Sequence, residues 1–173
     1  MMNANVAKLM NEQINKELYS AYLYLEFANH FDEAGLDGFA NWYKIQAREE
    51  QDHAMLFYQY LQNNNQKVTL EAIGQPTAAP ECHLEVLKAA LKHEEYVTSL
   101  INTIYEAAIE AKDYRSMNFL NWFIDEQGEE EMNATALIDK MEMFGGPDSK
   151  GGLYMLNQEL AGRSYSAPSL SLD

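Results

Sequence analysis

The stretch Glu49-Glu50-Gln51-Asp52-His53 decides how this chain folds, because Glu50 has a matching acidic residue, Glu17, 33 positions earlier. About halfway between them lies Asp32-Glu-Ala-Gly35-Leu-Asp37-Gly38. This composition is typical of a helix end, a tight turn and a new helix whose N-cap is Asp37. Antiparallel helices joined by such a turn place equidistant residues at the same depth. The sequence therefore predicts a helical hairpin in which Glu17 faces Glu50.

A second pair has the same spacing, because Gln127 follows Glu94 by 33 residues and Lys112-Asp113-Tyr114 interrupts the helical pattern near their midpoint. Residues 66–82 contain Gly74, Pro76 and Pro80 and have little helical period, which is typical of a long crossover. Apolar periodicity predicts helices over about 5–34, 38–64, 83–111, 115–144 and 152–162. The expected fold is an all-α four-helix bundle with one long crossover and a short fifth helix, residues 1–162. Residues 163–173 are Ser-rich and are expected to form a flexible tail.

Composition narrows the classes of function. The chain has 173 residues, 47% of them hydrophobic, which favours a single globular domain, and its net charge of −15 disfavours nucleic-acid partners. Such an acidic excess suits cation partners, although solubility alone is the simpler explanation. The single Cys82 excludes an intrachain disulfide and a thiolate zinc site, and fits a reducing cytosol. We expect no signal peptide and no membrane span, hence a cytoplasmic protein.

The two pairs also predict a chemistry. Glu50-x-x-His53 and Gln127-x-x-Glu130 each place two polar side chains on one helix face, and Glu17 and Glu94 interrupt apolar stripes. Four core carboxylates with one imidazole, and no Lys or Arg at that depth, need a cation. Any one of these residues alone is more simply a solvated or hydrogen-bonded helix position. Together they indicate a dinuclear site for iron or manganese, or for zinc.

Several neighbouring residues keep two interpretations. Glu49, Glu126 and Glu129 are either exposed helix charge or a third metal position next to the dinuclear site. Tyr24 lies two turns after Glu17 and is either a core aromatic or a redox-active ring beside the metal. For Trp122, packing is the favoured interpretation.

The motifs together resemble a known family. These are Asn11-Glu-Gln-Ile-Asn-Lys-Glu17-Leu-Tyr-Ser-Ala-Tyr-Leu-Tyr24, Glu49-Glu50-x-x-His53, Lys92-His-Glu94, Asn118-Phe-Leu-Asn-Trp122-Phe-Ile-Asp-Glu126-Gln127 and Gly152-Leu-Tyr154. Over residues 5–162 the chain resembles the bacterial non-haem ferritins of the ferritin-like superfamily. The resemblance implies a homo-oligomeric, 24-subunit hollow shell that oxidises Fe(II) with O2 or H2O2 and stores an Fe(III) mineral.

The resemblance also implies a role for each site residue. Glu17, Glu50 and His53 would hold the first iron, and Glu50 would bridge to a second iron. Glu94 and Glu130 would hold that second iron with Gln127 alongside. Tyr24 would stand near the centre, and a third iron site would comprise Glu49, Glu126 and Glu129.

Departures separate this chain from other relatives. Haem-containing bacterioferritins resemble it but have Glu-x-x-His in the fourth helix and a haem-ligating Met before the second-helix His, where this chain has Asp52, so no haem is expected. Rubrerythrins have a further domain with paired Cys-x-x-Cys motifs, which a chain with one cysteine lacks. The DNA-protecting mini-ferritins often have basic tails, whereas the tail of this chain has no basic cluster. The carboxylates of animal ferritin three-fold channels are replaced by Met117, Asn118, Leu120 and Asn121. Two alternatives remain: a di-iron oxygenase or peroxidase without mineral storage, and a helical assembly protein with structural zinc.

Overall fold

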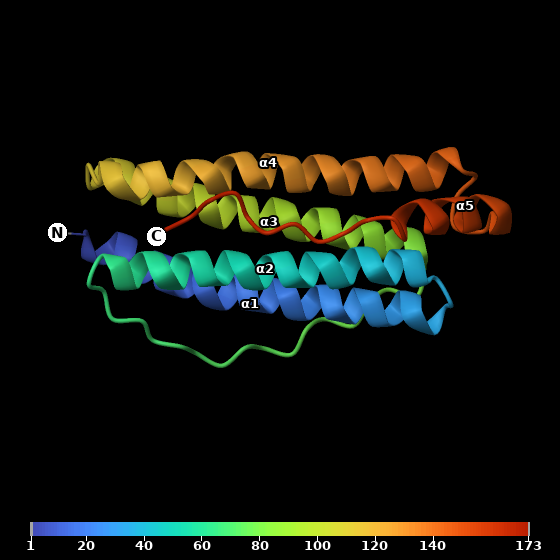
Figure 1. Ribbon diagram of the computed structural model, residues 1–173, viewed down its shortest axis with the longest axis horizontal. Helices are drawn as coiled ribbons and strands as arrows, with labels where there is room; N and C mark the ends of the chain where they lie inside the picture. Colours follow the sequence, from blue (N-terminus) through green and yellow to red (C-terminus); the bar gives the residue numbers. More distant parts are fainter. Residues whose placement is uncertain (1, 173) are drawn as a thin grey trace.

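The computed structural model describes residues 2–172 and contains five helices in this range, with no strand. The first hairpin comprises α1 (Ala4–Glu33) and α2 (Asp37–Asn63), and the second comprises α3 (His83–Glu110) and α4 (Tyr114–Met143). The short helix α5 (Lys150–Leu160) packs at one end of the bundle, as Figure 1 shows. The predicted all-α bundle with one long crossover and a fifth helix is confirmed.

Local capping explains where the helices begin and end. The side chain of Asn3 accepts hydrogen bonds from the first turn of α1, and that of Asp113 accepts one from Ser116 N of α4. Gly35 ends the first hairpin arm at φ +73, in the left-handed region that glycine adopts without strain. The prediction of Asp37 as the N-cap was wrong by one residue. Leu36 is the N-cap of α2, and Asp37 is its first helical residue. α5 begins two residues before the predicted start because Ser149 caps it.

Two extended segments run along opposite faces of the bundle (Figure 1). The crossover between α2 and α3 lies along α1, where Asn11 and Thr69 exchange two hydrogen bonds of 3.0 and 2.8 Å. The C-terminal segment, residues 163–172, returns along α2 and α4. Neither this segment nor the crossover forms regular secondary structure within the described residues. The predicted flexibility of the tail concerns its motion and stays a prediction.

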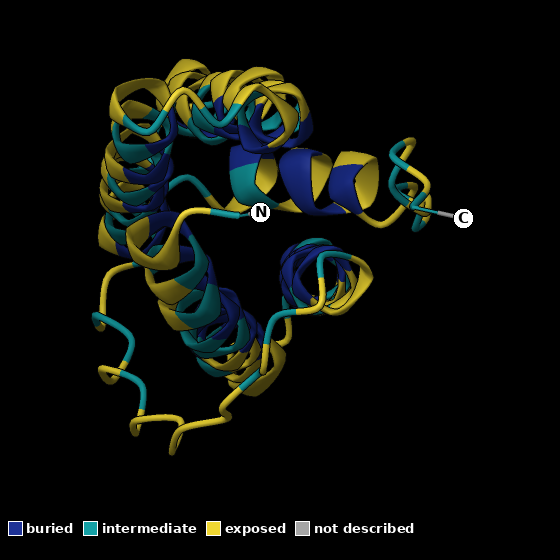
Figure 2. Cartoon of the chain, turned by 90° about the vertical axis from the view of Figure 1, so that its left-hand side faces the viewer, coloured by how far each residue is buried: buried dark blue, intermediate teal, exposed yellow. Residues whose placement is uncertain are grey.

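The core of the bundle has two apolar parts separated by a polar layer. Buried residues face inward on all four long helices, as Figure 2 shows. One apolar cluster includes Phe31, Phe39 and Leu137 near the α1–α2 turn, and the other includes Met10, Phe57 and Leu120 towards the opposite end. The buried Glu17 and Glu50 belong to neither cluster. No helix within residues 2–172 combines the length and apolarity that crossing a membrane requires.

The side chain of Asn157 joins helix α5 to the start of α2. The Oδ1 atom of Asn157, which is buried, accepts hydrogen bonds from the backbone N–H groups of Gly38 and Phe39, at 2.8 and 3.2 Å. Its Nδ2 atom donates to Asp37 at 3.0 Å. A Cβ atom at Gly38 would lie 1.8 Å from the backbone oxygen of Asn157, so glycine permits this close approach. Asn157 therefore satisfies the orphan N–H groups of α2 that a local cap would otherwise serve.

Candidate metal centre

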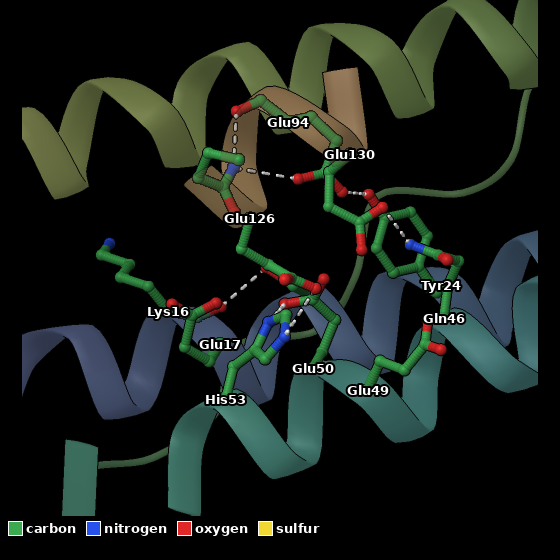
Figure 3. A network of polar contacts seen from close by, with 12 residues as sticks. Lys16, Glu17, Tyr24, Gln46, Glu49, Glu50, His53, Glu94, Glu126 and Glu130 are labelled. Atoms are coloured by element: carbon green, nitrogen blue, oxygen red, sulfur yellow. Dashed lines mark hydrogen bonds and ion pairs between the residues drawn. The ribbon is translucent and has the colours of Figure 1, made fainter. Parts of the chain in front are cut away.

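The first half of the candidate centre combines residues from α1 and α2. One ligand atom from each of Glu17, Glu50 and His53 lies within 4.8 Å of the others, and all three side chains are buried (Figure 3). The Nδ1 atom of His53 lies 3.5 Å from an oxygen of Glu50. The i, i+3 spacing on α2 thus places both side chains towards Glu17, as the sequence predicts.

The second half of the centre comes from α3 and α4. The Nε2 atom of Gln127 donates to the carboxylate of Glu94 at 3.2 Å and to its backbone oxygen at 3.3 Å. The hydroxyl of Tyr24 donates a hydrogen bond to the other oxygen of Glu94. Glu130 is buried beside Glu94. Burial is the main cause that raises the pKa of Glu94, and the charge of Glu130 is the second. The structure therefore brings both of the 33-residue pairs into one layer.

Two glutamines that sequence reasoning missed support this layer. Gln13 donates to Glu17 at 2.9 Å, and Gln46 donates to Glu130 at 2.8 Å across the bundle. Both amides are buried, and each lies four residues before a site glutamate of its own helix. A buried amide one turn before a core carboxylate is the signal that could have identified them.

Burial dominates the electrostatics of the carboxylates. It raises the pKa of Glu17 to about 8, with a further rise from the charge of Glu50. Burial likewise raises the pKa of Glu94 to about 8 and those of Glu50 and Glu130 to about 7. Without a cation, the charged forms are disfavoured because the low-dielectric interior gives them too little solvation.

The imidazole of His53 responds in the opposite sense. Burial favours its neutral form, but its contacts with Glu126 and Glu50 outweigh burial and hold the pKa of His53 well above its ordinary value. Burial, followed by the charge of Glu94, raises the pKa of Tyr24 well above its usual range. Tyr24 is therefore a neutral donor at physiological pH.

The residues present fit a bound metal ion on three grounds. The Oε2 atom of Glu17 is buried and has no hydrogen-bond partner among the described residues, which is costly unless a cation serves it. A cavity of about 20 Å3 borders Tyr24, Glu94 and Glu130, enough for a single small ion. Oxygen donors with one imidazole suit iron, manganese or zinc. The arrangement can bind divalent cations between the two hairpins.

The remaining predicted acids lie at different depths. Glu126 is half-buried with an oxygen 3.7 Å from Nε2 of His53, whereas Glu129 is exposed. Glu49 is half-buried and pairs with Arg163 at 2.7 Å, and the charges of His53 and Glu126 also act on its pKa. Trp122 packs edge-on against His53 with ring centroids 5.5 Å apart, consistent with the favoured packing role.

Four long helices enclosing a buried layer of paired carboxylates define the class of ferritin-like bundles with an intrasubunit metal centre. Residues 7–144 match the family described as "Ferritin-like domain". A bacterial non-haem ferritin of Campylobacter jejuni is 38% identical over 158 residues, covering 91% of this chain and 93% of that protein. A bacterial non-haem ferritin of Staphylococcus epidermidis is 36% identical, and the match covers 96% of this chain and 99% of that protein.

Solved structures agree with the sequence relatives. The open pore ferritin from Archaeoglobus fulgidus superposes with a TM-score of 0.92 at 36% identity, covering 95% of this chain and all of that one. A form of the same protein engineered to be closed gives a TM-score of 0.92 at 35% identity. The chain belongs to the ferritin-like family, and its similarity extends over nearly its whole length to bacterial non-haem ferritins.

Proposed function

We propose that this chain is an iron-storage ferritin that oxidises Fe(II) at the buried centre and stores the Fe(III) product as a mineral inside a 24-subunit homo-oligomeric shell. Its ferritin-like family membership supports iron handling in a multimeric assembly. The observation that carries the proposal is the layer of four buried carboxylates and one imidazole; no lysine or arginine within residues 2–172 is buried as deeply as this set. The electron acceptor is O2 or H2O2, and no haem takes part.

Each residue has a role in holding the substrate iron. Glu17, Glu50 and His53 bind the first Fe(II), and Glu50 reaches from it to a second. Glu94 and Glu130 bind the second ion. This assignment is supported by the common depth of the two hairpin pairs and by the small cavity beside Glu94 and Glu130.

Five further residues orient or extend this centre. The amide of Gln127 and the hydroxyl of Tyr24 both donate to Glu94 and so hold that carboxylate in place. A group of half-buried and exposed acids beside His53 offers a third position for a departing ion. This group comprises Glu49, Glu126 and Glu129.

The protein side of the reaction is electrostatic. Hard carboxylate oxygens favour Fe(III) over Fe(II), and this preference is the chemistry that oxidation exploits. Because burial raises the pKa of Glu17 and of Glu94 to about 8, both carboxyls hold protons near neutral pH. Binding of Fe(II) must therefore displace protons from the layer. The donors from Gln13 and Gln46 keep two of the carboxylates oriented while the ions enter and leave.

Paired variants test the proposal. Glu50→Ala and His53→Ala each remove a ligand of the first ion and should abolish fast Fe(II) oxidation, followed by stopped-flow absorbance. Glu106→Ala, an exposed position of α3, should oxidise at the unmodified rate. Native mass measurement should find 24 subunits in all of them. Unchanged oxidation rates in assembled Glu50→Ala and His53→Ala shells would contradict the assignment.

A further inference from the structure

The C-terminal segment, residues 163–172, crosses the face formed by α2 and α4 and is attached along its length (Figure 1). Tyr165 donates to Asp52 at 2.7 Å and lies under the guanidinium of Arg48, 3.5 Å from the ring centroid. Trp122 of α4 donates to Ser169 at 2.9 Å. The segment is thus anchored to both helices that supply His53 and Glu130.

Arg163 begins this segment and carries its most specific contact. Its Nη2 atom lies 2.7 Å from the carboxylate of Glu49, and both side chains are mostly buried, at 18% and 16% exposed. Its Nη1 atom donates to the backbone oxygen of Trp42 at 3.3 Å, and the guanidinium stacks 4.0 Å above the Trp42 ring. Asn41 donates to the backbone oxygen of Arg163 at 3.0 Å. The position of this cation is therefore determined by four contacts.

This position is next to the metal centre. Trp42, on which Arg163 stacks, also lines the small cavity beside Glu94 and Glu130. The charge of Arg163 lowers the pKa of Glu49, opposing the larger effect of burial. Glu49 therefore has a guanidinium partner supplied by the C-terminal segment.

We propose that Arg163 is a built-in counter-cation for Glu49, so that a metal ion binds there only by displacing the guanidinium. This deepens the proposed function and rests on it, since it concerns the third position of that centre. A carboxylate engaged in a charged hydrogen bond offers less free charge to a metal ion. Arg163 thereby keeps metal ions at the dinuclear centre and weakens their retention at Glu49, as a positioning residue rather than a ligand.

Calorimetric titration with Zn2+, which is not oxidised, tests this without iron turnover. The unmodified protein should show two tight steps per chain and a weak third one. Arg163→Gln should tighten the third step by about tenfold or more, the size expected for loss of one competing charged hydrogen bond. Arg163→Lys keeps the positive charge and should restore weak third-site binding. Arg115→Gln, the same charge change at an exposed residue bonded to Asn64, should leave all steps unaltered.

The double variant Arg163→Gln/Glu49→Gln should not show the tighter third step of Arg163→Gln. That loss of affinity would assign the third step to Glu49. A third step of equal affinity in the unmodified protein and in Arg163→Gln would overturn the inference and leave the proposed function standing. An equal gain in Arg115→Gln would also overturn it, because the effect would then be net charge. Absence of the two tight steps in the unmodified protein would overturn the proposed function and the inference with it.

Discussion

Glu17→Gln should stabilise the metal-free protein in a pH-dependent way, because the native carboxyl is forced into a buried site. The folded chain raises the pKa of Glu17 from 4.5 to about 8, chiefly by burial. Below about pH 4.5, folded and unfolded chains both hold the proton, and the carboxyl costs nothing. As the pH rises to 8, the unfolded chain ionises freely while the folded one does not, so stability is lost across this window. At pH 8 the loss is roughly 4 kcal/mol as an upper limit, because one pKa unit equals about 1.36 kcal/mol.

A glutamine keeps the shape of the side chain and can still accept the hydrogen bond that Gln13 donates. Urea unfolding with a chelator, at fixed protein concentration, should therefore find Glu17→Gln more stable by up to about 4 kcal/mol at pH 8 and by under about 1 kcal/mol at pH 5. Glu12→Gln, an exposed change on the same helix, should shift stability by less than about 0.5 kcal/mol at either pH. Divalent metal should stabilise the unmodified protein more than the variant. Equal stabilities at pH 8, or the same difference at both pH values, would refute the reasoning.

Three other changes test separate contacts. Gly38→Ala would place a Cβ atom 1.8 Å from the backbone oxygen of Asn157, so α5 must shift. The free energy of unfolding should therefore fall by about 2–4 kcal/mol in urea denaturation. An unaltered denaturation midpoint would disprove the close approach. Lys112→Gly relieves a left-handed backbone at φ 52 and should add about 0.5–1 kcal/mol in the same assay, whereas a loss would contradict the strain argument. Tyr24→Phe removes the hydroxyl that donates to Glu94 and should slow Fe(II) oxidation about tenfold in stopped-flow measurements with metal stoichiometry unchanged; a reduced stoichiometry would instead make Tyr24 part of the binding site.

The sequence predicted the bundle well because its signals are local. Apolar periodicity and the turn residues around Gly35 and Asp113 determine where the long helices begin and end to within one or two residues. The equal separation of the two polar pairs then determines their depth, because the helices are straight and antiparallel. This regularity made the layer around Glu17 and Glu94 predictable before any contact was known.

The rest depends on contacts between residues far apart in the sequence, which leave no local pattern. Asn157 caps α2 from α5, and Arg163 reaches Glu49 from beyond the last helix. A Ser-rich tail has the composition of a mobile segment, and nothing in it indicates that Tyr165 meets Asp52. Gln46 likewise reads as an ordinary helix residue until α4 places Glu130 opposite it.

Anomalous diffraction from crystals soaked with Fe(II) without oxygen tests the central claim most directly. Data at the iron absorption edge should show two peaks in the buried layer of each chain, one near Glu17, Glu50 and His53 and the other near Glu94 and Glu130. The Glu50→Ala shell, soaked in the same way, should lose the first peak. Iron found only on the surface of the bundle, with no peak in this layer, would contradict the account.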